Sequence, residues 1–419
     1  MPDPDGGWAS PAAPLPGAPR VAVVGAGALG GWLALWLGRR GARVTLLDAW
    51  GPGNSRSSSG CETRVLRAIY GSDGLYTRWV ERALGLWLEA ERLTNRRLYR
   101  QTGALWLFGG DDSYARASLP HLAAAGLPAE QLELAAAAER WPQISFDGVV
   151  SVFHEERAGY LAARRACRAI AGAAVAAGGE LRRTAARPGA IAGGRMGPLA
   201  LGSGGGGGGG GDGGGGRLAA DVYVFACGPW LGELFPDVLG PRIRPTRQEV
   251  FYFGTPADAG GRFGDAALPV WMDVGEHVVY GIPGNDDRGF KVADDTRGDT
   301  FDPTHGERTP SAAALDRARR HLARRFPGLA GAPLLEARVC QYENTPDGQL
   351  LVDRHPRAAN AWLLGGGSGH GFKLAPAVGE YAAGLILDGG APHPQVALAR
   401  FDRIAGDPPT TQFASGALR

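Results

Sequence analysis

Residues 20–48 read RVAVVGAGALGGWLALWLGRRGARVTLLD, and this stretch decides the fold class. Its first apolar run, VAVV, predicts a short buried strand, and the apolar residues that follow recur at helical spacing. The run ARVTLLD then predicts a second strand. A strand, a turn, a helix and a strand in this order are typical of an α/β protein with a parallel sheet.

The turn in this stretch predicts a dinucleotide site. Gly25, Gly27 and Gly30 have the G-x-G-x-x-G spacing, and Asp48 ends the second strand. Such glycines allow a tight turn, a close approach of the backbone to a pyrophosphate, and close packing of helix on strand. The helix N-terminus attracts the phosphates, and Asp48 is placed to accept a hydrogen bond from a ribose hydroxyl. The pattern by itself does not separate NAD from FAD.

Length and charge narrow the class of protein further. A chain of 419 residues exceeds one simple core, so we expect two domains. The net charge is +2 with no basic run, which argues against nucleic acid as a partner. The uncharged run 21–38 just reaches the length of a membrane span, but its five glycines argue against one. Residues 1–19 are expected to form a disordered tail without a signal peptide, and residues 202–216 a flexible glycine-rich loop.

Other segments predict the remaining elements. Helices are expected over residues 74–94, 158–178 and 311–326, and strands within residues 98–108. The segments PTRQEVFYF, EHVVYGIP and GFKVADD predict a mostly antiparallel second region. A glycine-rich loop then leads into a closing helix from about Lys373.

The four cysteines are scattered, at positions 61, 167, 227 and 340, which fits a reducing compartment and hence the cytoplasm. Cys227 follows a buried strand and is expected in the core. Cys340 is either a small buried hydrophobe or a residue with chemistry, and the residues alone leave both open. The eight histidines do not cluster at metal-ligand spacings, so no metal site is expected.

Lysine is almost absent. Of the 44 basic residues only Lys291 and Lys373 are lysine. An ammonium is a compact point charge and a guanidinium a wide planar fork, so a site with room for only the smaller ion would keep its lysine. Both lysines are therefore candidate functional residues, although two surviving surface lysines would look the same.

From Arg20 to about residue 390 the chain resembles the monomeric sarcosine oxidase family of the D-amino acid oxidase superfamily. These flavoenzymes oxidise N-methyl amino acids and related secondary amines such as pipecolate. The resemblance rests on GAGALG with LLD, on SSSGCETRVLRAIYG against the family loop S-x-H-G-D-T-R-x-x-R, on RQEVFYF, on VYGIP followed by GFKVA, on RVCQY, and on GGGSGHGFKLAPAVGE.

The resemblance implies a role for several residues. Cys340 matches the cysteine that forms a thioether to the 8α-methyl of FAD, and Lys291 the lysine near flavin N5 that stabilises superoxide. Lys373 and Arg67 match the residues that bind the substrate carboxylate. Tyr280 matches a tyrosine that shapes the substrate pocket.

Further matches concern the flavin itself. Arg64 matches the arginine against the flavin ring. Gly369, His370 and Gly371 would bring backbone N–H groups and a helix N-terminus toward the pyrimidine edge, where reduced flavin gathers negative charge. A purely packing role for the His370 ring stays open.

The chain departs from the family pattern at several positions. Gly60 or Ser59 replaces the loop histidine, and Cys61 replaces the glycine after it. Asp295 stands where sarcosine oxidases often have histidine, which favours a more cationic or polar amine than sarcosine. Glu343 and Asn344 also differ.

The expected fold is α/β (α+β overall): a GR2-type, Rossmann-like FAD-binding domain with a second, antiparallel-sheet substrate domain. The FAD-binding domain is expected from residues 20–95, 145–240 and 335–395, and the substrate domain from residues 96–144 and 241–334. The expected reaction is FAD-dependent oxidation of a secondary amino acid amine to an imine, with O2 reduced to hydrogen peroxide. A dehydrogenase that passes electrons to a partner or quinone, and a non-catalytic flavoprotein subunit, are the alternatives. A monomer or small homo-oligomer is expected.

Overall fold

The computed structural model describes residues 17–202, 216–257 and 261–404. The predicted tail up to residue 16 and the glycine-rich segment 203–215 lie outside the described residues.

The first of two main sheets has six strands in the order β21-β22-β15-β1-β2-β9, and all neighbours are parallel except β21 and β22. The inner parallel strands β1, β2, β15 and β22 carry short apolar runs, as strands covered on both faces require, whereas the edge strand β9 is mostly polar and exposed. The strands are β1 (Arg20–Val24), β2 (Arg43–Asp48), β9 (Glu180–Arg183), β15 (Val222–Phe225), β21 (Leu351–His355) and β22 (Ala358–Gly365).

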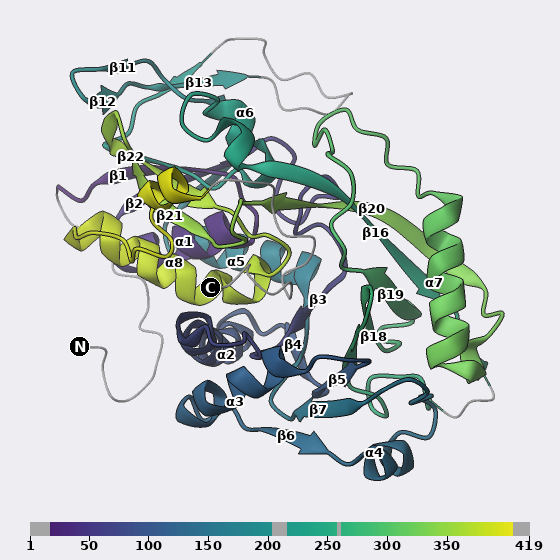
Figure 1. Cartoon of the computed structure of the whole chain (residues 1–419). Coiled ribbons are helices and arrows are strands. Elements are labelled where there is room, and N and C mark those ends of the chain that lie inside the picture. Colours follow the sequence, from purple (N-terminus) through teal and green to yellow (C-terminus); the bar gives the residue numbers. More distant parts are fainter. Residues whose placement is uncertain (1–16, 203–215, 258–260, 405–419) are drawn as a thin grey trace.

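Helices cover one face of this sheet, where α1 packs between α5 and α8, and α2 lies outside α8 (Figure 1). A layer of short strands and α6 covers the other face. The helices are α1 (Ala28–Arg39), α2 (Gly74–Thr94), α5 (Ala163–Ala176), α6 (Leu231–Leu234) and α8 (Gly371–Asp388). The short strands are β10 (Ala185–Arg187), β11 (Ile191–Ala192), β12 (Arg195–Met196), β13 (Leu199–Gly202) and β14 (Arg217–Leu218).

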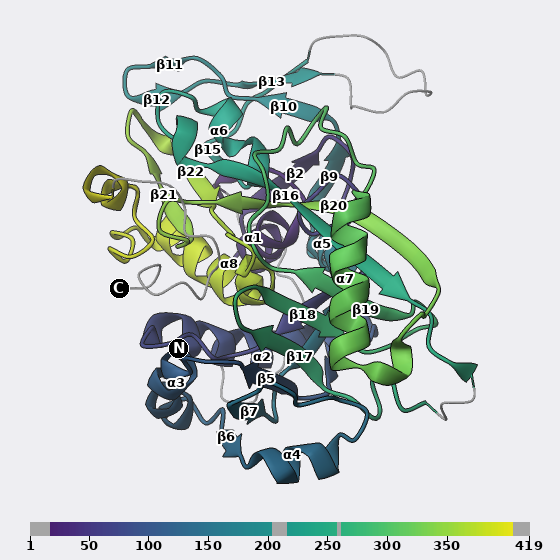
Figure 2. The same cartoon turned by 45° about the vertical axis from the view of Figure 1, so that its right-hand side comes forward.

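The second main sheet has eight strands in the order β20-β16-β19-β18-β17-β5-β7-β6, antiparallel except for the pair β5 and β17. Helices α7 (Ala312–Arg325) and α4 (Leu134–Arg140) pack against one apolar face of it (Figure 2). The strands are β5 (Ala104–Phe108), β6 (Ala129–Leu132), β7 (Ser151–Glu155), β16 (Arg244–Phe253), β17 (Val270–Val274), β18 (Val278–Ile282), β19 (Phe290–Asp294) and β20 (Leu334–Asn344).

The α/β class with an antiparallel second sheet is confirmed, but two strands lie elsewhere than the sequence placed them. β7 and β20 fall in segments assigned to the FAD-binding domain, and both hydrogen-bond into the eight-stranded sheet. Strand pairing depends on distant partners, which the local pattern does not specify.

A small sheet joins the two main parts. It has the order β3-β8-β4, with β3 (Thr63–Leu66), β4 (Tyr99–Gln101) and β8 (Gly159–Ala162), and helix α3 (Ser113–Ala124) packs near α2. Its first strand carries Arg64 and leads directly to Arg67.

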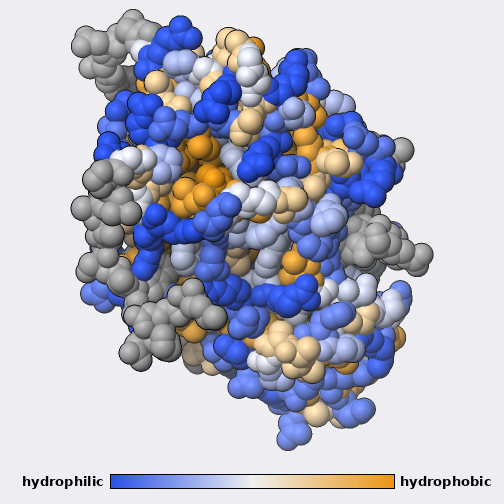
Figure 3. All heavy atoms as spheres, turned by 90° about the vertical axis from the view of Figure 1, so that its left-hand side faces the viewer, coloured by the Kyte–Doolittle hydropathy of each residue, from blue (hydrophilic) through white to orange (hydrophobic). Residues whose placement is uncertain are grey.

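The apolar run 21–38 forms β1, a glycine turn and α1 inside this fold. Within the described residues, no helix has the length and apolar character to cross a membrane. Polar side chains dominate the face drawn in Figure 3, and apolar side chains gather in its hollows.

Candidate active site

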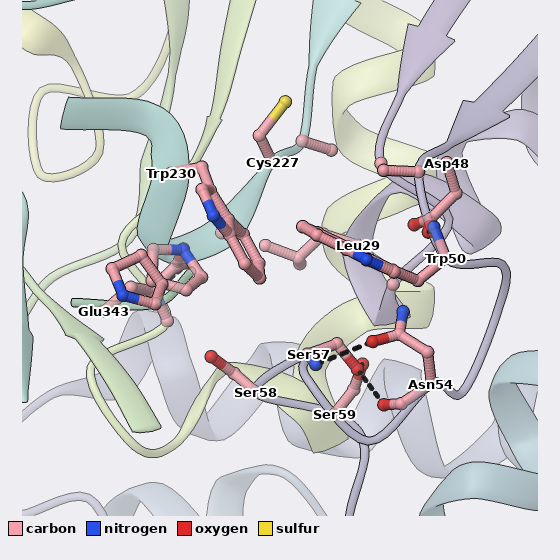
Figure 4. Close-up of a pocket in the computed structure, with 18 of the residues that line it drawn as sticks. Leu29, Asp48, Trp50, Asn54, Ser57, Ser58, Ser59, Cys227, Trp230 and Glu343 are labelled. Atoms are coloured by element: carbon pink, nitrogen blue, oxygen red, sulfur yellow. Dashed lines mark hydrogen bonds between the residues drawn. The ribbon is translucent and has the colours of Figure 1, made fainter. Parts of the chain in front are cut away.

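A cavity of about 750 Å³ lies at the carboxyl ends of the parallel strands. Figure 4 shows Asp48 and Trp50 on one side of it and Trp230 and Glu343 on the other. In open parallel sheets ligands bind at this edge, where the strand order reverses.

The predicted glycine turn forms part of the cavity wall. Gly25 has a φ of +104°, and a side chain there would overlap the carbonyl of Ala226. At Gly30 a side chain would overlap the carbonyl of Gly25, so the helix packs against the turn without a gap. Gly27 lines the cavity, and a Cβ there would lie 3.5 Å from the Ser59 hydroxyl. Gly25 and Gly30 therefore leave no room for a side chain, as the tight turn and the close helix packing require, and Gly27 faces the cavity.

Asp48 lines the same cavity but already holds the turn together. Its carboxylate accepts hydrogen bonds from the backbone N–H of Ala26 at 2.8 Å, of Trp50 at 2.9 Å and of Gly51 at 2.7 Å. Burial raises the pKa of this carboxyl, and the backbone donors offset part of the rise. Oδ1 accepts two of these bonds and Oδ2 accepts one, so Oδ2 keeps a lone pair that a ribose hydroxyl can use.

Glu343 is a buried carboxyl in the opposite wall. One oxygen, Oε1, accepts from the backbone N–H of Gly367 at 2.8 Å. The other, Oε2, is buried and has no hydrogen-bond partner among the residues that the structure describes. Burial raises the pKa of Glu343 to about 7. A buried polar atom without a partner is costly, so Oε2 calls for a polar group of a bound molecule.

A second cavity, of about 50 Å³, adjoins the first. The two share four wall residues, which are Arg64, Tyr342, Gly369 and Phe372. The small cavity adds charged groups from distant segments, namely Arg67, Asp295 and Lys373, together with Tyr280. A molecule in the large cavity therefore meets one in the small cavity along this shared wall.

Arg67 and Lys373 form a buried cationic pair in the small cavity. They are 2% and 4% exposed, and both lie over the ring of Tyr70, at 4.6 Å for the guanidinium carbon and 5.0 Å for Nζ. Lys373 Nζ donates to the carbonyl of His370 at 3.2 Å. Burial, followed by the charge of Arg67, lowers the pKa of Lys373 well below its usual range. Two desolvated cations side by side favour an anionic ligand.

Glu155 is a buried carboxylate close to this pair, and the sequence did not single it out. It accepts from the Ala68 N–H at 2.6 Å and from Trp106 Nε1 at 2.7 Å, which holds the chain just after Arg67. Burial raises its pKa, and the charge of Arg67 opposes this rise. The one signal in the sequence is its place at the end of the run SVFHE, which contains apolar residues and forms β7.

Lys291 lies on β19 and is fully buried. Its Nζ donates to the carbonyl of Thr63 at 3.1 Å and lies 5.3 Å from the centre of the Tyr280 ring. Burial, then the charge of Arg64, lowers its pKa to about 8. Both lysines of the chain are therefore buried, Lys291 beside Tyr280 and Lys373 beside Tyr70.

Arg64 connects the two cavities to Cys340. Its guanidinium donates to the carbonyls of Thr63, at 2.9 Å, and of Ser58, and Nη2 lies 3.6 Å from Cys340 Sγ. Cys340, on β20, is 6% exposed. A neighbour that the sequence did not pair with it, Cys61, packs in the same small cluster.

The loop before α8 differs from expectation in one respect. The backbone N–H groups of His370 and Gly371 both donate to the carbonyl of Gly367 at 2.8 Å, so these two amides are already used within the turn. The His370 ring is 3.1 Å from the Tyr70 hydroxyl and 2.9 Å from the Gly348 carbonyl. Burial lowers its pKa well below the usual range, which fits a neutral ring that hydrogen-bonds Tyr70 and Gly348.

Asp295 and Cys227 each line one of the two cavities. Asp295, 6% exposed, accepts from the Tyr342 hydroxyl at 2.7 Å and lines the small cavity. Cys227, expected in the core, lies instead in the wall of the large cavity with its thiol 3.4 Å from the Val24 carbonyl. A strand that ends at a glycine turn places its last residues at the sheet edge, where the cavity begins.

Comparisons with known proteins agree with this geometry. The model of the FAD dependent oxidoreductase family matches residues 20–385. The monomeric sarcosine oxidase of Streptomyces avermitilis is 30% identical over 395 residues, 93% of this chain and 98% of that protein. The N-methyl-L-tryptophan oxidase of Salmonella typhi is 26% identical, over 87% of this chain and 94% of the relative.

Among solved structures, the L-proline dehydrogenase from P. horikoshii superposes with a TM-score of 0.77 at 22% identity, over 93% of this chain and 99% of that one. This likeness concerns the fold. The resemblance to the sarcosine oxidases is confirmed, and so is the predicted class, a FAD-dependent oxidoreductase acting on CH–NH donors. By its sequence over nearly the whole described length, the chain belongs to the FAD dependent oxidoreductase family.

Proposed function

We propose that this protein oxidises the C–N bond of a small amino acid whose amine is secondary, either N-methylated or cyclic, and that O2 is the electron acceptor. The observation that carries the proposal is the small cavity, in which Arg67 and Lys373 are buried together next to the large cavity. Several relatives act, by their names, on sarcosine or on N-methyl-L-tryptophan, both N-methyl amino acids.

The substrate carboxylate is assigned to Arg67 and Lys373. Their positive charges are desolvated, and an anion within hydrogen-bond reach of both would be held strongly in so dry a site. Tyr70 lies under both cations, and Glu155 fixes the chain beside Arg67, so the pair is preorganised. The cavity volume of about 50 Å³ favours a compact substrate.

The residues in the large cavity fit FAD. Gly25, Gly27 and Gly30 would allow the close approach of a pyrophosphate, and Asp48 at the end of β2 would hold a ribose hydroxyl. The buried Oε2 of Glu343 would take a further polar contact. When bound, FAD accepts a hydride from the substrate carbon and passes the electrons to O2.

The chain's own contribution to the chemistry is electrostatic and positional. Buried cations beside the substrate disfavour an ammonium, so the amine is held neutral, which is the form that can lose a hydride. Tyr280 and Asp295 border the small cavity and limit the shape and polarity of the amine. Lys291 holds a buried positive charge that would stabilise the negative charge formed as O2 is reduced.

Covalent attachment of FAD through Cys340 is part of the proposal. Its support is the single thiol on β20, close to Arg64, at the position that the family motif indicates. The four cysteines are all free, which supports a cytoplasmic or other reducing location.

The test combines substrate and cofactor. Hydrogen peroxide would be measured with sarcosine, proline, pipecolate and N-methyl amino acids, each against its methyl ester, which keeps the amine and lacks the carboxylate. Oxidation of one or more acids at least a hundredfold faster than its ester supports the assignment. Equal rates for acid and ester would remove Arg67 and Lys373 from substrate binding.

A dehydrogenase is the second candidate, since one structural neighbour is named as such. Turnover with a dye but not with O2 would favour it. For the linkage, acid precipitation should leave the flavin colour in the protein pellet, and Cys340→Ser should release it to the supernatant.

A further inference from the structure

Residues 393–400, near the end of the described chain, contact the loop 345–350 that joins β20 to β21. A buried ion pair connects the two segments. Arg400 Nε donates to Oδ2 of Asp347 at 2.8 Å, and Nη2 donates to the carbonyl of Gln349 at 3.0 Å. Arg400 is 5% exposed. Because breaking a buried ion pair leaves an uncompensated charge, this contact holds the loop in one position.

Gln395 makes a second contact from the same segment. Its side-chain amide donates to Oε1 of Gln349 at 3.0 Å and to the carboxylate of Asp73. Asp73 caps helix α2, where it accepts from the backbone N–H of Tyr76 at 3.3 Å. The Tyr76 hydroxyl in turn accepts from the backbone N–H of Leu350 at 2.9 Å. The C-terminal segment therefore ties the loop to the start of α2.

The loop also holds His370, which immediately precedes α8. His370 Nε2 lies 2.9 Å from the carbonyl of Gly348, and Nδ1 lies 3.1 Å from the hydroxyl of Tyr70. A carbonyl can only accept, so Nε2 carries the hydrogen. Burial lowers the pKa of the ring and keeps it neutral, so Nδ1 accepts from the Tyr70 hydroxyl. These bonds join Tyr70 to the loop through a single tautomer of His370.

Tyr70 lies against both cations of the small cavity. The guanidinium carbon of Arg67 is 4.6 Å from the centre of its ring, and Nζ of Lys373 is 5.0 Å from it. Nζ of Lys373 also donates to the carbonyl of His370 at 3.2 Å. A cation is attracted to the face of an aromatic ring and not to its edge, so the tilt of the Tyr70 ring affects where both cations lie. The bond between Tyr70 and His370 fixes that tilt.

We propose that Arg400 is a positioning residue for substrate binding, which acts through His370 and Tyr70 on the two cations of the small cavity. The inference rests on the proposed function, which assigns the substrate carboxylate to these cations. Arg400 lies on η5 (Leu398–Arg403), outside the walls of both cavities, so it reaches the substrate only through this series of contacts. The contacts order the site before the substrate arrives. Their loss should therefore weaken binding of a carboxylate and leave the flavin and the chemical step in place.

The test compares each acid substrate with its methyl ester in the flavin-loaded, full-length enzyme. Rates are normalised to bound flavin, which removes the effect of unfolded protein. Arg400→Met and Tyr70→Phe should each raise KM for the acid roughly 3- to 10-fold, the range for one lost hydrogen bond, and leave kcat nearly unchanged. The value of kcat/KM for the ester should stay close to that of wild type. A merely structural role would lower the rates with acid and ester alike.

A double-mutant cycle asks whether Arg400 acts through Tyr70. The combined variant should raise KM for the acid no more than the larger single effect, because both substitutions break the same series of contacts. The matched control is Asp402→Asn, also on η5, whose partner Arg242 lies 3.2 Å away at an exposed site. This variant should keep the wild-type KM. If Arg400→Met does not fold, Asp347→Asn weakens the same ion pair and should give the same pattern with a smaller rise in KM.

The outcomes distinguish the inference from the proposed function. Single effects that multiply in the combined variant would show that Arg400 acts by another route, and would overturn the inference. Equal losses with acid and ester, or an unchanged KM for the acid, would overturn it as well while leaving the carboxylate assignment intact. A wild-type enzyme that does not distinguish acid from ester would overturn the assignment and the inference together.

Discussion

The two cavities are built in different ways. The large one lies at the edge of the six-stranded sheet, and much of its wall comes from the continuous stretch 20–59. Its glycine turn works through the absence of side chains. The small cavity gathers charged side chains from segments far apart in the sequence. Arg64 lies on β3, Arg67 just after β3, Asp295 just after β19, and Lys373 on α8.

We expect the large cavity to bind the cofactor and the small cavity to serve the reaction. A dinucleotide is held by backbone groups and by shape, which tolerate little steric change. The charged groups of the small cavity instead act through desolvation and mutual repulsion, which lower the pKa of Lys373. The same two causes lower the pKa of Lys291, which lies beside Tyr280 outside the cavity wall. Damage to the first region should therefore remove the cofactor, and damage to the second should leave the cofactor and change the rate or the pH profile.

The largest effect is expected at the glycine turn. Gly30→Val should abolish flavin binding, because even a Cβ at this position overlaps the Gly25 carbonyl. Absorbance near 450 nm of the purified protein measures it. Gly31→Ala is the matched control, since its Cβ would meet only Ile170 at an ordinary 3.7 Å. A yellow Gly30→Val protein would refute the steric argument.

The next effect concerns the substrate carboxylate. Arg67→Met and Lys373→Met should each keep the flavin and lower kcat/KM by roughly 10²- to 10⁴-fold, the range for loss of one partner of a buried charge contact. Arg82→Met is the control, because Arg82 forms an exposed ion pair with Glu380. If kcat/KM fell equally in all three variants, the effect would lie in the packing of α2 on α8.

We expect Lys291 to act in the reoxidation of the flavin by O2 and not in the oxidation of the amine. Lys291→Met should slow reoxidation by O2 roughly 10²-fold and leave turnover with a dye acceptor nearly unchanged. With its pKa at about 8, the wild-type rate with O2 should fall as pH rises through that value, and the variant should lack this fall. Stopped-flow reoxidation of reduced enzyme measures both. Equal losses with O2 and dye would assign Lys291 to amine oxidation.

The same residue should affect stability. Its pKa is lowered from 10.5 to about 8, so the unfolded chain binds more protons between these values. The free energy of unfolding contributed by Lys291 should therefore rise with pH from about 8 to 10.5, and Lys291→Met should remove this rise. Thermal unfolding across that window, followed by circular dichroism, gives the comparison.

The smallest effect is expected at Glu343. Because its pKa is raised to about 7, the folded state binds more protons than the unfolded state between 4.5 and 7. The free energy of unfolding contributed by Glu343 should fall as pH rises through that window. The decrease in Tm between pH 5 and pH 8 should therefore be ~2–4 °C smaller in Glu343→Gln than in wild type. An unchanged Tm difference between pH 5 and pH 8 would show that a bound molecule already satisfies Oε2 as an acceptor.

Several features could be predicted from the sequence because their causes are local. The glycine turn and its flanking strands follow from periodicity and from the steric needs of a tight turn, and helix α2 matches the predicted bounds 74–94. The two lysines stood out by composition before any contact was known. Their burial follows the same logic, since a compact cation suits a dry, crowded site.

Only the tertiary structure decided which distant residues meet. Strand pairing places β7 and β20 in the eight-stranded sheet, brings Cys61 to Cys340, and puts Glu155 beside Arg67. The turn before α8 uses the amides of His370 and Gly371 internally, a bond that depends on loop geometry. The pKa shifts and the unpaired buried atoms arise from these long-range contacts, because the free energy of an ionisable group depends on the groups around it in space. The sequence thus determined the fold class and the cofactor class, and folding determined the electrostatics of the site.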